Sequence, residues 1–176
     1  MPKRWKPRVT VAAIIERDGR FLLVEEHTSE GLKLNNPAGH LDPGESPEQG
    51  AAREVLEETA RVFTPDHLVG VYLSRYQRHQ PSLPTRLRAG AKHEPEDVTF
   101  LRFAFAGSVG DADPRLTLDT GIVRTLWLSA EELRACPERH RSPLLLACIE
   151  DFLAGRRYPL SLIHADPSLY APEVRS

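Results

Sequence analysis

Residues 39–60, GHLDPGESPEQGAAREVLEETA, join a loop rich in glycine and proline to a strongly marked helix start. Ser46 can cap the helix with its hydroxyl, Pro47 needs no amide partner at the first helical position, and Gln49 can reach back to the cap. The 3.6-residue period then predicts an apolar stripe that faces a sheet, formed by Ala52, Val55, Leu56 and Thr59. The segment therefore predicts a helix that begins near Ser46 and packs on a β-sheet.

Three glutamates of this helix, Glu54, Glu57 and Glu58, fall within a sector of about 100° beside the apolar stripe. Glu54 and Glu58 form a like-charge i,i+4 pair, and anions near a helix C-terminus oppose the macrodipole, so each costs about a few tenths of a kcal/mol. Arg53 and Arg61 can each pair with Glu57, but the sequence offers the other two glutamates no obvious cation. Another source of positive charge is therefore expected.

The loop before the helix can bring further oxygen ligands to these glutamates. Glu45 lies at its end, and the glycines and prolines around it allow backbone carbonyls to come close. Hard oxygen atoms grouped in this way suit Mg²⁺ or Mn²⁺, which commonly join one or two protein carboxylates to substrate phosphates. A solvated acidic helix face is the alternative. The context favours a divalent metal site, with Mg²⁺ as the expected ion.

The rest of the chain predicts an α/β fold. An Asp-Gly dipeptide at 18–19 favours a tight hairpin turn, Ser129 with Glu132 forms a capping box, and Ser142-Pro143 predicts the cap and first position of another helix. Segments rich in β-branched and aromatic residues predict strands at 9–16, 20–26, 67–76, 98–109 and 121–129. Strands flanked by helices predict an α/β sandwich with a mixed sheet.

Length and composition exclude several classes of protein. The 176 residues fit a single domain, with a core at about 7–164 and a short C-terminal tail. No apolar run approaches the roughly 20 residues that span a membrane, and the net charge of −2 gives no general attraction to nucleic acid. The two cysteines, Cys136 and Cys148, lack zinc-site spacing and suit a reducing compartment. We therefore predict a cytoplasmic protein without membrane or nucleic-acid partners.

The stretch from Gly39 onward resembles the Nudix box, in which Gly, five residues, Glu, seven residues and Arg-Glu-aliphatic-x-Glu-Glu-x-Gly-aliphatic form a loop-helix-loop for diphosphate hydrolysis. Two positions depart from this pattern, because Ala60 replaces a glycine and Arg61 an aliphatic residue. Alanine is penalised in the left-handed conformation that usually stops the helix, so the departure concerns the helix end rather than the ligands. The matching positions are Gly39, Glu45, Arg53, Glu54, Val55, Glu57 and Glu58.

The resemblance implies the Nudix α/β/α sandwich with a mixed β-sheet, and a role for each matching residue. Arg53 would be the orienting cation, and Glu57 is the first candidate for the base that takes a proton from water. The implied metal ligands are Gly39 through its carbonyl, Glu45 as an outer or auxiliary ligand, and Glu54, Glu57 and Glu58 directly.

Segments outside the box, PAGHLD, RSPLLLACIEDFLAG and RRYPLSLI, resemble the bacterial NudJ-type phosphatases. This resemblance covers most of residues 7–164 except the middle loop, and implies hydrolysis of phosphoanhydride bonds in nucleoside di- and triphosphates or in thiamine-pathway diphosphates, namely hydroxymethylpyrimidine diphosphate and thiamine diphosphate. The alternatives are an ADP-ribose or dinucleotide pyrophosphatase and a non-catalytic Nudix-fold nucleotide sensor. The expected partner is a small diphosphate or nucleotide, and the expected state is a monomer or homodimer.

Residues 77–97, rich in Pro, Arg and His, fit neither the helical nor the strand period and predict a long loop. Arg75, Arg86 and Arg88 in and beside this loop could close over substrate phosphates, because a planar guanidinium can hold two phosphate oxygens at once. A solvated, mobile insertion is the alternative.

Asp119 precedes the strand expected at 121–129. Nudix proteins often carry an acidic residue several positions before a tryptophan such as Trp127, and in some members it acts as general base or extra ligand. An aspartate that merely starts the turn before Gly121 is the alternative.

Aromatic and histidine side chains are further candidates for substrate contact. His40, directly after the first glycine of the box, could touch phosphate, although a lone histidine is more often structural. Strand aromatics could stack on a base, but most are expected in the core: Tyr72, Tyr76, Phe103 and Phe105.

Overall fold

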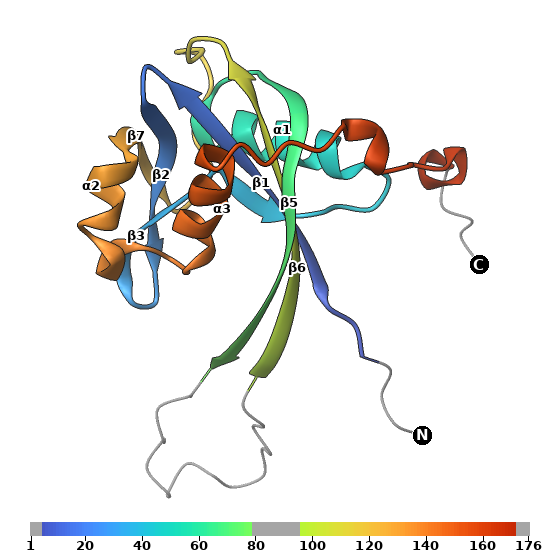
Figure 1. The fold of residues 1–176 in the computed structure, drawn as a ribbon, viewed down its shortest axis with the longest axis horizontal. Helices are drawn as coiled ribbons and strands as arrows, with labels where there is room; N and C mark the ends of the chain where they lie inside the picture. Colours follow the sequence, from blue (N-terminus) through green and yellow to red (C-terminus); the bar gives the residue numbers. More distant parts are fainter. Residues whose placement is uncertain (1–4, 79–95, 172–176) are drawn as a thin grey trace, which may run out of the picture.

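Secondary structure is described for residues 5–78 and 96–171 in the computed structural model (Figure 1). The strands are β1 (Arg8–Arg17), β2 (Arg20–Thr28), β3 (Gly31–Asn35), β4 (Ala38–His40), β5 (Phe63–Arg78), β6 (Glu96–Val109) and β7 (Ile122–Ser129). The helices are α1 (Pro47–Thr59), α2 (Ala130–Arg134) and α3 (Leu144–Leu153), with short 3-10 turns η2 (Pro137–Arg139), η3 (Leu160–Leu162) and η4 (Pro167–Tyr170).

The strands form a mixed sheet in the order β3-β2-β1-β6-β5, with β4 paired to β1 and β7 paired to β2. β1 runs parallel to β6 and antiparallel to β2 and β4. Asp18 and Gly19, with φ of 53° and 76°, close the hairpin between β1 and β2. The predicted hairpin and mixed sheet are thus confirmed, while the short strands β3 and β4 were not predicted.

Helices cover both faces of the sheet, as Figure 1 shows for α1 and α3. Side chains alternate along β1, so that Val11 and Ala13 pack with Val55 of α1, whereas Ala12 and Ile14 pack on the opposite face. That second face is covered by Leu145, Cys148 and Ile149 of α3. The predicted α/β/α sandwich is confirmed. None of the helices that the structure describes is long and apolar enough to cross a membrane.

The predicted helix starts hold for α1 and α2. The Gln49 amide donates to Ser46 Oγ at 3.4 Å, and the Ser46 amide donates to Gln49 Oε1 at 2.8 Å. Ser129 and Glu132 form the same reciprocal pair before α2. α3 begins at Leu144 without a side-chain cap, one position later than predicted.

The end of α1 adopts the left-handed conformation despite the missing glycine. Ala60 has φ of 54° and ψ of 30°, and its amide donates to the Leu56 carbonyl at 2.9 Å. Alanine costs about 1–2 kcal/mol there, and the helix still stops at the position where the box has its glycine. Arg61 donates to the Gly110 carbonyl at 2.9 Å rather than pairing with Glu57.

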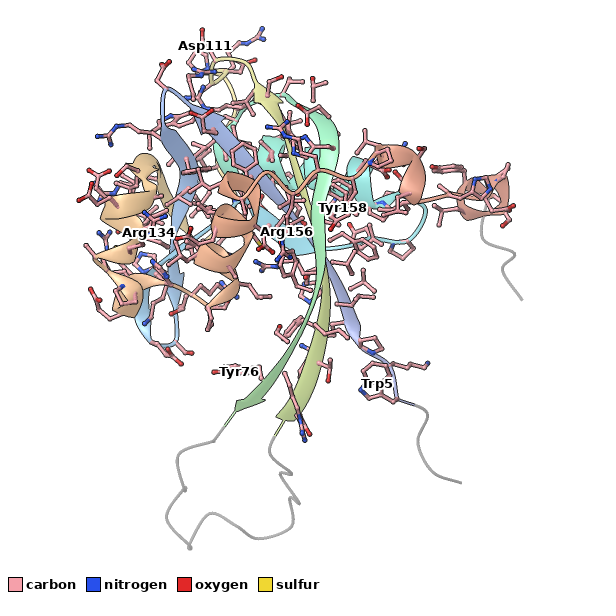
Figure 2. All side chains as sticks on the ribbon, in the orientation of Figure 1. Trp5, Tyr76, Asp111, Arg134, Arg156 and Tyr158 are labelled. Carbon is pink, nitrogen blue, oxygen red and sulfur yellow. The ribbon has the colours of Figure 1, made fainter. Side chains whose placement is uncertain are left out.

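β5 and β6 continue beyond the last pairing of β6 with β1 as a two-stranded arm, 75–78 with 96–99, that projects away from α1 (Figure 1). Their pairing runs out to Arg78 and Glu96, so the loop predicted for 77–97 was wrong at both ends. Backbone hydrogen bonds between the two strands hold these end residues extended although their sequence has no clear hydropathy period. Tyr76 projects from this arm (Figure 2) and is 50% exposed, so it is not a core residue. The loop residues Arg86 and Arg88 lie outside the described residues.

Candidate active site

Two carboxylates of α1 are turned into the protein. Glu54 and Glu58 are 8% and 9% exposed, whereas Leu56, predicted to face the sheet, is 38% exposed. The predicted apolar stripe was therefore wrong at Leu56, because α1 is rotated so that these two carboxylates face β4. The other buried residues of α1 are Gly50, Ala51, Val55 and Thr59.

The charged face of α1 lies along the free edge of β4. Glu58 Oε2 accepts a hydrogen bond from the Ala38 amide at 2.9 Å, and Arg53 Nη2 donates to the His40 carbonyl at 2.9 Å. Alternate residues of an antiparallel strand direct their backbone groups to opposite edges. Ala38 and His40 therefore face away from β1, toward the helix.

Gly39 lies between these two residues and has the opposite orientation. Pro37 and Leu41, two positions away on either side, are hydrogen-bonded to β1, so the Gly39 carbonyl also points toward β1. The predicted role of that carbonyl as a ligand is therefore corrected, and the Ala38 carbonyl occupies the edge instead. Gly39 provides space, since a Cβ there would collide with the Glu54 carboxylate.

Arg53 holds three carboxylates together. Its Nε and Nη2 donate to Glu45 at 3.0 and 2.7 Å, and its Nη1 donates to Glu54 at 2.7 Å and to Glu57 at 2.9 Å. The predicted pair between Arg53 and Glu57 is present. The prediction that Glu54 has no cation beside it was wrong, because Arg53 also pairs with Glu54. These bonds raise the pKa of Arg53 and lower that of Glu45. We call Glu45, Arg53, Glu54, Glu57 and Glu58 the β4-edge site.

Glu58 is the carboxylate of the β4-edge site whose negative charge is least offset by favourable contacts. Burial raises its pKa to about 8, against the opposing hydrogen bond from Ala38, and the charges of Glu54 and Glu26 add to the rise. No lysine or arginine pairs with Glu58 in the part of the chain that the structure describes. A cation placed beside this carboxylate would relieve the repulsion.

Asp119 is held next to the same carboxylates. Its amide donates to the Glu57 carbonyl at 3.0 Å, which ties the segment before β7 to the end of α1. Burial raises the pKa of Glu54 against the bonds from Arg53, and the charges of Glu57 and Asp119 add to the rise. Asp119 also raises the pKa of Glu58. The structure thus brings Asp119 into reach of the β4-edge site, as the sequence suggested.

The chemistry of the β4-edge site fits a divalent cation. Among residues 5–78 and 96–171, no three His, Cys, Asp or Glu side chains are arranged to enclose a metal ion, since the Arg53 guanidinium lies between Glu45, Glu54 and Glu57. The donors are nonetheless hard oxygens, which Mg²⁺ and Mn²⁺ prefer. Burial is the main cause of the raised pKa of Glu58, and a cation bound beside this carboxyl would favour its charged form.

We expect the melting temperature of the metal-free protein to fall between pH 4.5 and about 8 through Glu58. A carboxyl with a raised folded-state pKa keeps a proton that the unfolded chain has lost, so rising pH favours unfolding across this window. Thermal unfolding in chelating buffers at several pH values measures the slope. Glu58→Gln cannot titrate and should show a shallower decline, and identical slopes for the two proteins would contradict the assignment.

Two candidates for phosphate contact lie elsewhere. Arg75 belongs to the β5–β6 arm, not to a loop, and pairs with Asp97 there, with Nε 2.7 Å from Oδ1. The arm projects away from α1 (Figure 1), so the structure does not bring Arg75 to the β4-edge site. The His40 ring is exposed and lies 6.3 Å from the Phe100 ring, so only its backbone carbonyl joins the site.

Glu26 was missed in the sequence. It is 9% exposed, two residues before the end of β2, forms an ion pair with Arg141, and its charge contributes to the raised pKa of Glu58. The available signal was a pair of consecutive glutamates closing an otherwise apolar strand, since at least one of them must face inward.

Comparisons with known proteins agree with this geometry. Residues 5–147 match the family described as NUDIX domain. The chain is 35% identical over 159 residues to Phosphatase NudJ of Escherichia coli strain K12, covering 90% of this chain and 92% of that protein. A solved NUDIX hydrolase from Nitrosomonas europaea is 46% identical, with a TM-score of 0.77 and coverage of 92% and 98%. A MutT NUDIX hydrolase from Burkholderia pseudomallei, 20% identical with a TM-score of 0.61 and coverage of 84% and 98%, shares the fold alone.

Proposed function

Because this chain belongs to the NUDIX family and is a hydrolase of phosphoanhydride bonds, we propose that it is a Mg²⁺-dependent phosphatase of nucleoside di- and triphosphates or of thiamine-pathway diphosphates. Its similarity to Phosphatase NudJ over nine tenths of the chain supports a phosphatase, and the NudJ-type resemblance of its sequence implies the substrate class. The observation that carries the proposal is the pair of buried carboxylates, Glu54 and Glu58, directed at the free edge of β4 beside Arg53.

Each residue of the β4-edge site has a proposed role. Glu54, Glu57 and Glu58 would hold Mg²⁺, for which Mn²⁺ can substitute, with Glu45 as an auxiliary ligand. The ion would neutralise phosphate oxygens and acidify an attacking water. Arg53 fixes the positions of the carboxylates, and Glu57, whose side chain is 40% exposed, would be the base that takes a proton from the attacking water.

Glu57→Gln is expected to lower kcat about a hundredfold or more, because the general base is lost. Asp119→Asn is expected to lower kcat about tenfold or more. The charge of Asp119 reaches both buried glutamates, and its carboxylate would serve as a second proton acceptor or metal ligand. Steady-state kinetics of both variants at saturating Mg²⁺ show which of the two carboxylates contributes more to kcat. A loss below tenfold in Asp119→Asn removes Asp119 from the chemistry and leaves it a turn residue.

A substrate panel tests the proposed function. ADP, CDP, GTP, hydroxymethylpyrimidine diphosphate, thiamine diphosphate and ADP-ribose are incubated with Mg²⁺ or with excess chelator, and orthophosphate and pyrophosphate are scored separately. Orthophosphate release from a nucleoside or thiamine-pathway diphosphate, only with metal, is the expected result. Preference for ADP-ribose would favour the pyrophosphatase alternative, and binding without turnover would favour a nucleotide sensor.

The remaining properties stay predictions. A single domain, a cytoplasmic location and a monomeric or homodimeric state are what we expect for this chain. Fractionation of cells would measure the location, and light scattering of the purified protein would measure the oligomeric state.

A further inference from the structure

A row of four side chains crosses the sheet beside the β4-edge site. The strand register pairs His40 of β4 with Thr10 of β1, Thr10 with Arg102 of β6, and Arg102 with Tyr72 of β5. Residues paired in this way share one face of a sheet. Tyr72 packs against the core under α3, so the whole row lies on the α3 face.

Arg102 in this row has two guanidinium nitrogens without an acceptor among the described residues. Its Nε and Nη1, and the neighbouring Thr10 Oγ1, are buried and have no hydrogen-bond partner among the described residues. Burial lowers the pKa of Arg102, and the nearby Cys148 and Glu26 offset this effect only in part. Buried cations are normally paired, because an unpaired one loses its hydration without compensation. The orphaned donors therefore indicate an acceptor that residues 5–78 and 96–171 do not supply.

Arg102, which lacks this acceptor, lies close to the β4-edge site. Glu26 is near both places, since its charge raises the pKa of Glu58 and opposes the lowering of the pKa of Arg102. Thr10 separates the strand of Arg102 from the edge strand, and two strand steps span about 10 Å. The two phosphates of a diphosphate are too short to cover that distance. A substrate held by its phosphates at the edge of β4 and extended along this row would place its organic half at Arg102.

We propose that Arg102 recognises a hydrogen-bond acceptor, a carbonyl oxygen or ring nitrogen, on the organic half of the diphosphate substrate. Thr10 donates beside it, and the Tyr72 ring, fixed by its hydroxyl bond to Asp151 at 2.9 Å, offers an aromatic surface. This assignment rests on the proposed function, because the phosphates define where the organic half begins. Arg102 as a whole residue is only partly buried, although its Nε and Nη1 are covered.

The test compares ligands with and without an organic half. The probes are the α,β-methylene analogues of ADP and CDP, and methylenediphosphonate, none of which can be cleaved at the bridging carbon. Titration calorimetry with Mg²⁺ present should give affinities for the nucleotide analogues about tenfold weaker or more in Arg102→Met, which loses a charged hydrogen bond. The affinity for methylenediphosphonate should stay within about twofold.

Thermal stability separates a binding role from a structural one. Replacing an uncompensated buried cation by an apolar side chain of similar length should leave the melting temperature of the ligand-free protein unchanged or raise it by about 2 °C or more. Arg134→Met is the matched control, because Arg134 lies on α2 (Figure 2) and pairs with Glu150 at the surface. That variant should change neither affinity.

Four outcomes would overturn the proposal. They are equal losses for the nucleotide analogues and methylenediphosphonate, no loss for either, a lowered melting temperature with general loss of binding, and no binding of either nucleotide analogue by the wild-type protein. Should Arg102→Met not fold, Arg102→Lys must show the same selective loss, since its compact ammonium cannot reproduce the planar fork. Selective loss in a protein that hydrolyses nothing in the substrate panel would refute the proposed function while sustaining the role of Arg102.

Discussion

Glu58→Gln is expected to lower kcat/KM about a thousandfold or more, because a metal ligand that neutralises transition-state charge is worth several kcal/mol. The fold should remain intact. Glutamine has the same shape as glutamate, and it removes a buried carboxyl whose pKa is already raised to about 8. Its side-chain oxygen can still accept the bond from the Ala38 amide.

Steady-state kinetics and circular dichroism measure the two halves of this prediction. Glu48→Gln is the matched control, because Glu48 lies in the first turn of the same helix and outside the β4-edge site. Unimpaired turnover in Glu58→Gln, or equal losses in both variants, would exclude Glu58 from the chemistry.

Arg53→Ala is expected to reduce both activity and stability. Glu45 and Glu54 have side chains only 14% and 10% exposed, and each would lose its cation at neutral pH. The free energy of unfolding should fall by about 2–4 kcal/mol, less than for a fully buried pair because the Arg53 side chain is 27% exposed. kcat/KM should fall about a hundredfold, because the carboxylates are no longer held in place.

Urea denaturation at pH 7 measures the loss of stability. Arg53→Lys should rescue little, since a point-like ammonium cannot hold three carboxylates as the planar guanidinium does. Arg115→Ala, which breaks an exposed pair with Asp113, is the control and should leave the unfolding free energy almost unchanged. Similar effects of Arg53→Ala and Arg115→Ala would contradict the central position of Arg53.

Local signals made much of the fold predictable. The capping boxes at Ser46 and Ser129 and the Asp18-Gly19 turn depend on neighbouring residues only, and all three are present. The spacing of the glutamates likewise placed them on one side of α1. These features needed no knowledge of the tertiary structure.

Features set by tertiary packing were not predictable in the same way. The rotation of α1 that exposes Leu56 and buries Glu54 depends on where β4 lies, and β4 is only three residues long. The direction of the Gly39 carbonyl depends on the register with β1. The orphaned Arg102 appears only when strands distant in sequence are paired, because an arginine in an apolar segment looks like an ordinary surface residue.

The most direct measurement of the central claim is Mn²⁺ binding together with phosphate release in the same samples. Electron paramagnetic resonance of free Mn²⁺ gives the bound fraction for the wild-type protein, Glu58→Gln and Glu48→Gln. Wild type and Glu48→Gln should bind the ion and turn over substrate in proportion to it, whereas Glu58→Gln should do neither. Full turnover in excess chelator, or Mn²⁺ binding and turnover unchanged in Glu58→Gln, would contradict a metal-dependent hydrolase centred on the edge of β4.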